Sequence, residues 1–302
     1  MKAYPTISIL TNTYNPDLAL FEKSLQSIKA QDYPRNKLEH IVLDGGSEEK
    51  MLDLARNYGC DVLVKKKFKI NAEGRKVFGI KKAKHDIIFW LEADNVLPDK
   101  HTLASLVRPF LEHEYISYTY TLHYAYRRDK NFLDRYCSLV GSSDPVAMYL
   151  KKTDREAWSE QSTTKGTILN YENGYDIVAF SRKDLPTVGA NGFMIRRNVL
   201  LQAHLDPKTY LHTDIILDLI NKGFTKFGVV NNTSIDNLFA EKLLSHVRKR
   251  TMYLQQYSLT LQIAAKSLYM SCHLSAFGFP APKQSREPSL SHTRSEFYQA
   301  AE

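Results

Sequence analysis

The feature that most constrains the fold is a regular alternation of short apolar runs and amphipathic stretches over the first 95 residues. Runs typical of strands occupy residues 6–10, 38–43, 61–64 and 87–91. The intervening stretches carry apolar residues at helical spacing. Strand–helix–strand repetition predicts an α/β fold with a mostly parallel central sheet flanked by helices. Residues 87–91 are apolar on both faces, which indicates a central strand.

Local signals place the ends of these elements. Asn15 before Pro16 predicts the N-cap of the first helix, Ser47 predicts that of the second, and Gly59 marks where the second ends. Beyond Asn95 the alternation weakens. We expect helices at 103–111, from about 197 and at 214–220, and strands at 115–126, 189–195 and 226–230.

Length and composition limit the classes of protein to which the chain can belong. Its 302 residues allow one large or two small domains. We expect an α/β domain over 1–232, a C-terminal helical extension over 233–282 and a disordered tail over 283–302. Three widely spaced cysteines argue against a disulfide framework. The sequence contains no run of about 20 apolar residues, so it predicts no membrane-spanning helix. These features predict a cytoplasmic protein, while the net charge of +8 favours an anionic partner.

Polar clusters follow three of the predicted strands, at residues 12–15, 44–47 and 92–95. Ligands of parallel sheets bind at the carboxyl ends of the strands, so these clusters predict a binding site. Glu92 and Asp94 offer hard carboxylate oxygens suited to Mg²⁺ or Mn²⁺. Asp44 can accept a hydrogen bond from a base or a ribose hydroxyl, or it can simply close an Asp-Gly turn.

Further candidates lie along the chain. Arg75 and Lys76, near a helix start, suit a diphosphate or are solvated surface cations. Asp214 suits a general base, or it complements the dipole of the helix that it opens. Residues 189–192 form either a pocket wall or a β-turn. Arg248 and Arg250 either bind a departing diphosphate, bind an anionic membrane, or are simply exposed to solvent.

Three ordered segments carry a resemblance to a known family: residues 7–15 (ISILTNTYN), 41–47 (IVLDGGS) and 89–95 (FWLEADN). Together they resemble the family-2 glycosyltransferases of the GT-A fold, in order from Thr6 to about Val230. The resemblance implies an inverting transfer of a sugar from a UDP- or GDP-sugar to a hydroxyl of a glycan or lipid-linked acceptor. It implies a divalent metal, and no nucleic acid as partner.

The resemblance also assigns roles to residues. It implies Asp94 as the metal ligand and Asp214 as the general base. Asn191, Gly192 and His212 match the acceptor side. Arg248 and Arg250 match a diphosphate-binding patch. The positions that match the donor nucleotide site are Asn12, Tyr14, Asn15, Asp44, Arg75, Lys76 and Glu92.

The sequence departs from the family pattern in places. Glu92 stands where the metal motif usually has Asp, Thr213 replaces the usual Glu before the base, and Asn12 stands where Pro is common. The Gln-x-x-Arg-Trp signature of processive polysaccharide synthases is absent, which argues against a polymerase of that kind. Two alternatives stay open: a nucleotidyltransferase acting on sugar phosphates, and a catalytically inactive or nucleic-acid-binding α/β protein.

The segment 251–282 raises a separate question. It carries one full charge, Lys266, and keeps helical spacing directly behind Arg248 and Arg250. Such a helix either docks on the catalytic domain or lies peripherally on the cytoplasmic face of an anionic membrane.

Overall fold

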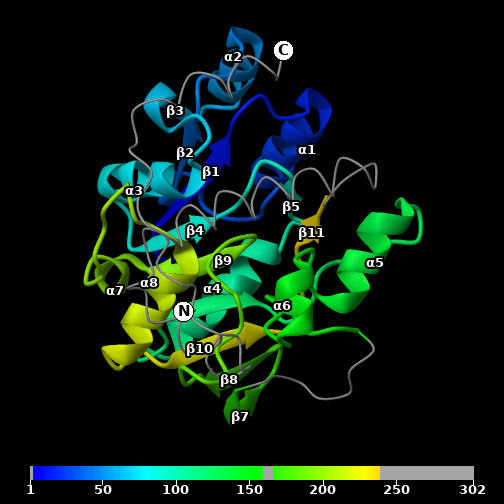
Figure 1. Ribbon diagram of the computed structural model, residues 1–302, viewed down its shortest axis with the longest axis vertical. Coiled ribbons are helices and arrows are strands. Elements are labelled where there is room, and N and C mark those ends of the chain that lie inside the picture. The colour runs from blue at the N-terminus through cyan, green and yellow to red at the C-terminus, as the bar shows by residue number, and fades with distance from the viewer. Residues whose placement is uncertain (1–2, 159–165, 239–302) are drawn as a thin grey trace, which may run out of the picture. The chain divides into compact units, whose positions relative to one another are not determined.

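A computed structural model describes residues 3–158 and 166–238, all of which belong to one compact unit of the chain (Figure 1). A nine-stranded sheet forms its centre, in the order β3-β2-β1-β4-β9-β6-β10-β8-β7. Strands β3, β2, β1 and β4 are parallel to one another, and β9 and β8 run antiparallel to their neighbours. The mostly parallel α/β sheet predicted from the sequence is confirmed.

The strands of this sheet are β1 (Ile7–Thr13), β2 (Leu38–Asp44), β3 (Asp61–Val64), β4 (Ile87–Trp90), β6 (Tyr118–Thr121), β7 (Thr167–Glu172), β8 (Tyr175–Ala179), β9 (Phe193–Arg196) and β10 (Lys226–Val230). A small second sheet pairs β5 (Asn95–Val96) with β11 (Asp236–Asn237). The helices are α1 (Leu18–Lys29), α2 (Glu49–Asn57), α3 (Ala72–Lys82), α4 (Thr102–Glu112), α5 (Phe132–Val140), α6 (Pro145–Tyr149), α7 (Arg197–Leu200) and α8 (His212–Asn221), with 3₁₀ turns η1 (Arg35–Lys37) and η2 (Lys66–Phe68).

Two apolar clusters hold the helices to the sheet. The larger joins α4 to β1 and β4, and the smaller joins α1 and α2 to β2. Helix α3 packs against β1 and β2, where Gly79 allows close approach: a Cβ there would lie 2.7 Å from a methyl carbon of Leu43. Parallel pairing of β1 with β2 and with β4 places the carboxyl ends of these strands along one edge of the sheet.

Several predicted element ends are wrong. Strand β1 continues to Thr13, so Asn12 lies within the strand rather than in the loop after it. The N-cap of α1 is Asp17, whose side chain accepts from the N–H of Leu20, and not Asn15. The N-cap of α2 is Glu48 rather than Ser47. Asn15 fails as a cap of its own helix because its backbone is left-handed, with φ of 39°.

Other differences concern the second half of the sheet. The predicted strand at 115–126 is reduced to β6, the predicted helix from 197 is the single turn α7, and the hairpin β7–β8 was not predicted. Strands β3 and β10 have the predicted bounds. Within residues 3–158 and 166–238, no helix is long and apolar enough to cross a bilayer. Of the expected helical extension over 233–282, residues 233–238 are described and include strand β11, whereas residues 239–282 and the expected tail at 283–302 lie outside the described residues.

Candidate active site

The three polar clusters do meet at one edge of the sheet. Parallel pairing sets Thr13 of β1 opposite Asp44 of β2, and Leu10 opposite Trp90 of β4. The clusters at 12–15, 44–47 and 92–95 therefore emerge side by side, as the parallel register requires.

Hydrogen bonds join the loops after β1 and β2. The N–H of Asn15 donates to Ser47 Oγ at 2.7 Å, and the N–H of Glu48 donates to Asn15 Oδ1 at 3.0 Å. Asp44 is fully buried, and its Oδ1 accepts from the N–H groups of Gly46 and Ser47. Asp44 thus closes the Asp-Gly turn that the sequence allowed as one of its two roles. The turn holds both loops in place.

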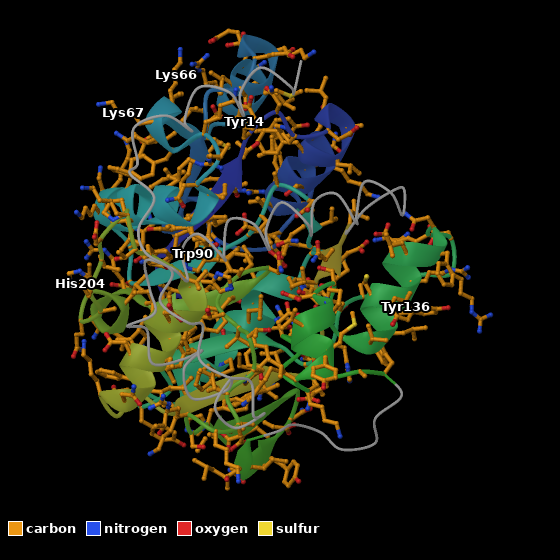
Figure 2. All side chains as sticks on the ribbon, viewed as in Figure 1. Tyr14, Lys66, Lys67, Trp90, Tyr136 and His204 are labelled. Atoms are coloured by element: carbon orange, nitrogen blue, oxygen red, sulfur yellow. The ribbon has the colours of Figure 1, made fainter. Side chains whose placement is uncertain are left out.

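Asn12 is the unusual residue of this edge. It is 6% exposed, and among the residues that the structure describes neither its side-chain oxygen nor its nitrogen has a hydrogen-bond partner. A buried amide without partners is costly, so such a group points to a ligand that completes it. The adjoining loop carries Tyr14, which is 37% exposed and lies under the ammonium of Lys69, with 5.0 Å between Nζ and the ring centroid. Figure 2 labels Tyr14 together with Lys66 and Lys67 of the η2 turn.

Arg75 and Lys76, near the start of α3, are both buried, so the alternative of solvated surface cations is wrong for these two residues. Arg75 is 2% exposed, and its Nη1 donates to the carbonyl oxygens of Phe68 and Lys69 at 2.7 and 2.8 Å. Lys76 is 1% exposed, and its Nζ lies 5.3 Å from the ring centroid of Trp90. Arg75 therefore shapes the loop that leads into α3, while Lys76 faces the end of β4.

An ionic network surrounds the buried Lys76, and its two carboxylate partners are each 23% exposed. Its Nζ lies 2.9 Å from Glu73 Oε1 and 3.4 Å from Glu92 Oε1. Burial by itself lowers the pKa of Lys76, but the charges of Glu73 and Glu92 outweigh burial and raise the pKa above its ordinary value. For Glu73, burial raises the pKa, while Lys76 and His212 outweigh it and hold the pKa below the usual range. Both groups are therefore charged at neutral pH.

Glu73 extends this network to the start of α8. Its Oε2 accepts from the backbone N–H of His212 at 3.0 Å and lies 3.0 Å from His212 Nδ1. His212 is the first residue of α8, and Asp214 stands in the first turn of that helix. The contacts His212–Glu73–Lys76–Glu92 therefore join the helix that carries Asp214 to the strand end that carries Asp94. Sequence reasoning missed Glu73, which lies 139 residues before His212.

The acidic motif after β4 is fixed by the small second sheet. Asn95 is fully buried; its Oδ1 accepts from the N–H of Glu92, and its Nδ2 donates to Asn237 Oδ1 at 3.1 Å. The N–H of Leu238 donates to the carbonyl oxygen of Asp94. Burial raises the pKa of Glu92; Lys76 opposes this, and Glu73 and Asp94 add to it. The side chain of Asp94 is half-buried at the same end of β4.

The loop before β9 lies beside the start of α8. Gly189, Asn191 and Gly192 have φ of 123°, 53° and 81°, a left-handed stretch that favours glycine and asparagine. A Cβ on Gly189 would lie 3.0 Å from the ring of His212. Gly192 N–H donates to Trp90 O at 2.7 Å. The structure therefore brings the predicted acceptor-side residues Asn191, Gly192 and His212 together, next to the end of β4.

Arg155, which sequence reasoning also missed, holds this loop. It is 1% exposed, and its Nη2 donates to the carbonyl oxygen of Asn191 at 2.6 Å. Its guanidinium lies 5.2 and 4.9 Å from the ring centroids of Tyr120 and Tyr124. The predicted diphosphate ligands Arg248 and Arg250 lie outside the described residues, as does the segment 251–282.

The fold resembles that of solved glycosyltransferases of the GT-A fold. A mannosyltransferase from Pyrobaculum calidifontis, solved with GDP-Man and Mn²⁺, superposes with a TM-score of 0.52 at 16% identity, covering 82% of this chain and 61% of that one. Glucosyl-3-phosphoglycerate synthase from Mycobacterium tuberculosis, solved with Mn²⁺, UDP and its glucosylated product, gives 0.51 at 17% identity, covering 92% and 82%. At these identities the likeness shows the fold.

The sequence comparison goes further. The model of glycosyl transferase family 2 matches residues 8–199, and the chain belongs to this family of enzymes. An uncharacterized glycosyltransferase of Mycobacterium tuberculosis strain H37Rv is 39% identical over 61 residues, 20% of this chain and 22% of that protein. The match thus spans about a fifth of the length of that relative. The family favours a glycosyltransferase over the nucleotidyltransferase and non-enzymatic alternatives.

Proposed function

We propose that the protein is an inverting glycosyltransferase that moves a sugar from a UDP- or GDP-sugar to a hydroxyl of a glycan or lipid-linked acceptor. The observation that carries this proposal is the network His212–Glu73–Lys76–Glu92, with its 2.9, 3.0 and 3.4 Å contacts. It fixes the helix of Asp214 relative to the acidic motif of Asp94. In-line displacement requires that the general base and the diphosphate site keep a fixed position relative to each other.

The donor nucleotide would occupy the edge formed by the loops after β1, β2 and β4. Asn12 offers both a donor and an acceptor to a base, and the absence of a partner for its side chain within residues 3–158 and 166–238 supports this role. Tyr14 and Asn15 border the same edge, and Asp44 fixes its shape. The donor edge would be supported from the interior by Arg75, Lys76 and Glu92. The buried Lys76 would bring positive charge towards the diphosphate. Arg248 and Arg250 are proposed as further diphosphate ligands.

The residues at the end of β4 fit a divalent ion. Within the described residues, no three His, Cys, Asp or Glu side chains could hold a metal by themselves. Mg²⁺ and Mn²⁺ suit such a site, because they commonly take one or two carboxylates and complete their shell with phosphate oxygens and water. Asp94 would hold the ion, in keeping with the Mn²⁺ and nucleotide ligands named for the two solved glycosyltransferases. When bound, it would neutralise charge on the departing diphosphate.

Asp214 would act as the general base. It would take the proton of the acceptor hydroxyl while that oxygen bonds to the anomeric carbon. The bond from this carbon to the phosphate oxygen breaks, and its electron pair leaves with the nucleoside diphosphate. Attack from the face opposite the leaving group inverts the anomeric centre. Asn191, Gly192 and His212 would line the acceptor side.

The test measures nucleoside diphosphate release from a panel of UDP- and GDP-sugars with Mn²⁺ and candidate acceptors. Asp214→Asn should reduce turnover about 10²–10⁴-fold while donor binding persists. Asp218→Asn, one turn further along α8 and 40% exposed in a pair with Lys222, is the matched control and should be near normal. Chelation of the metal should abolish release. Near-native turnover of Asp214→Asn would show that Asp214 is not the general base. Undiminished activity in EDTA would show that the reaction needs no divalent metal.

A further inference from the structure

Several exposed aromatic and apolar side chains lie on α5, at the end of α6 and at Trp158. We define the aromatic face as Phe132, Tyr136, Leu139, Tyr149 and Trp158. Phe132 is 73% exposed and Tyr149 is 79% exposed, which is far more than packing against the sheet would leave. Figure 2 labels Tyr136 on α5, at the margin of the ribbon in that view. Grouped exposed aromatics mark an interaction surface.

On α5, three of these side chains form one stripe. Phe132, Tyr136 and Leu139 follow helical spacing, and the rings of Phe132 and Tyr136 lie 6.2 Å apart. The backbone N–H of Trp158 donates to the carbonyl oxygen of Leu139 at 2.9 Å, so the backbone of Trp158 lies at the end of this stripe, while its indole stacks on the ring of His123. The opposite side of α5 is buried through Leu133 and Cys137. Helix α5 is thus amphipathic, with its second apolar side facing solvent.

Charge around the aromatic face is positive. Arg127 and Arg128, shortly before α5, and Lys151, shortly after α6, are all exposed. Among residues 126–158, all of which the structure describes, the one fully exposed acid is Asp129, and it pairs with Arg127 at 3.4 Å. Aromatic rings beside arginine and lysine are the composition of elements that lie in a membrane interface. Two copies of this face would bring like charges together, so self-association fits it less well.

We propose that the aromatic face binds an anionic phospholipid surface. The rings enter the headgroup region, and the three cations contact lipid phosphates. Binding of this kind needs no segment that crosses the bilayer. It depends on apolar area and on charge together, so it weakens when either is removed or when salt screens the charge.

The aromatic face adjoins the acceptor side of the candidate site. Trp158 Nε1 donates to the carbonyl oxygen of Tyr124, whose ring lies against Arg155. Arg155 in turn holds the loop at Asn191. A membrane bound at this face would therefore lie near the acceptor loop and favour a lipid-linked acceptor. This last step rests on the proposed function; the binding itself does not.

The experiment is co-sedimentation of the full chain with vesicles, without donor or metal. Vesicles of phosphatidylcholine mixed with phosphatidylglycerol should pellet the protein at low salt, and vesicles of phosphatidylcholine alone should pellet much less. Phe132→Ser and Tyr149→Ser should each weaken binding about tenfold. Arg128→Gln should weaken binding about fivefold, which corresponds to about 1 kcal/mol per cation near an anionic surface.

Matched controls alter equally exposed residues elsewhere. Tyr171→Ser, at a position 68% exposed on β7, and Lys208→Gln, at an exposed position before α8, should bind as the parent does. No pelleting of the parent chain overturns the proposal. So does equal pelleting of the parent and of the Phe132→Ser/Tyr149→Ser variant. A Phe132-dependent dimer without vesicle binding overturns it in favour of a second copy. If the chain pellets with vesicles but transfers no sugar, the membrane-binding inference stands and the proposed function is contradicted.

Discussion

The two halves of the sheet hold their buried cations in different ways. In the first half, Lys76 lies between two carboxylates, 2.9 Å from Glu73 and 3.4 Å from Glu92. In the second half, Arg155 lies against two tyrosine rings and donates to carbonyl oxygens, while its carboxylate neighbour Asp154 is 3.9 Å away. Both cations are almost fully buried, so burial alone does not distinguish them.

The difference shows what each cation contributes. An ammonium is a compact charge, and between Glu73 and Glu92 it balances the charge of two separate elements. A guanidinium is planar and donates hydrogen bonds in fixed directions. In Arg155, Nη2 donates to the carbonyl oxygen of Asn191, while the rings of Tyr120 and Tyr124 lie against the guanidinium. Loss of Lys76 should therefore affect charge balance first, and loss of Arg155 should affect the position of one loop.

The largest effect is expected for Lys76→Met. The substitution leaves Glu73 and Glu92 close together without their shared cation, and breaking a buried pair in this way costs about 3–5 kcal/mol. Urea unfolding should report the loss as a lower midpoint with an unchanged slope. The effect should shrink as the pH falls towards the range where the carboxylates take up protons, because a neutral pair no longer repels.

Lys82→Met is the matched control for this prediction. Lys82 stands on the same helix and pairs with Asp61 at 2.8 Å, but its side chain is 40% exposed. An exposed pair contributes about 0–1 kcal/mol, so this variant should unfold close to the parent. Equal losses from the two methionine variants would contradict the charge-balance role of Lys76.

A smaller effect compares one partly buried histidine from each half, His40 and His123. Burial lowers the pKa of His40 on β2 to about 4, and burial also lowers the pKa of His123, where a hydrogen bond with Glu156 O opposes the shift. Each unfolded histidine takes up a proton near pH 6.5, before the folded one does. Stability should therefore fall as the pH drops from about 6.5 towards 4, by roughly 2–3 kcal/mol for His40.

Urea unfolding across this pH range measures the effect. His40→Asn should flatten the acid side of the profile more than His123→Asn, because the hydrogen bond at His123 offsets part of the shift. A profile that keeps its full slope in His40→Asn would assign the acid sensitivity to other groups.

Most of the first half could be predicted from local pattern. Apolar runs and helical spacing place β1 to β4 and α1 to α3, and parallel pairing then brings the clusters at 12–15, 44–47 and 92–95 to one edge. The caps were harder, because Asn15 and Asp17 compete for one helix start. Asn15 instead adopts a left-handed backbone and accepts from Glu48 in the next loop. Two capping residues so close in sequence cannot be ranked without the tertiary contact.

The ionic network could not be predicted, for a different reason. In the sequence, Glu73 is the single acid among nine Lys or Arg between residues 65 and 84, which suggests a solvated surface, and its partner His212 is 139 residues away. Arg155 lies in a segment without clear periodicity, and its contact with Asn191 spans 36 residues. The exposed strand β7 and its partner β8 lack a regular alternation that would identify both strands. Such features depend on which elements meet, and periodicity does not contain that information.

The smallest effect on stability, and the most specific effect on function, is expected for Arg155→Lys. Lysine keeps the charge but not the planar guanidinium, so the bond to Asn191 O is lost at about 1.5 kcal/mol. Under the proposed function the acceptor KM should rise while the dissociation constant of the donor nucleotide stays unchanged, because the first half of the sheet is untouched. Arg128→Lys, at an exposed position, is the matched control and should alter neither value. If donor binding weakens as much as acceptor binding, the two halves act as one unit, and the division between charge balance in one and loop position in the other does not hold.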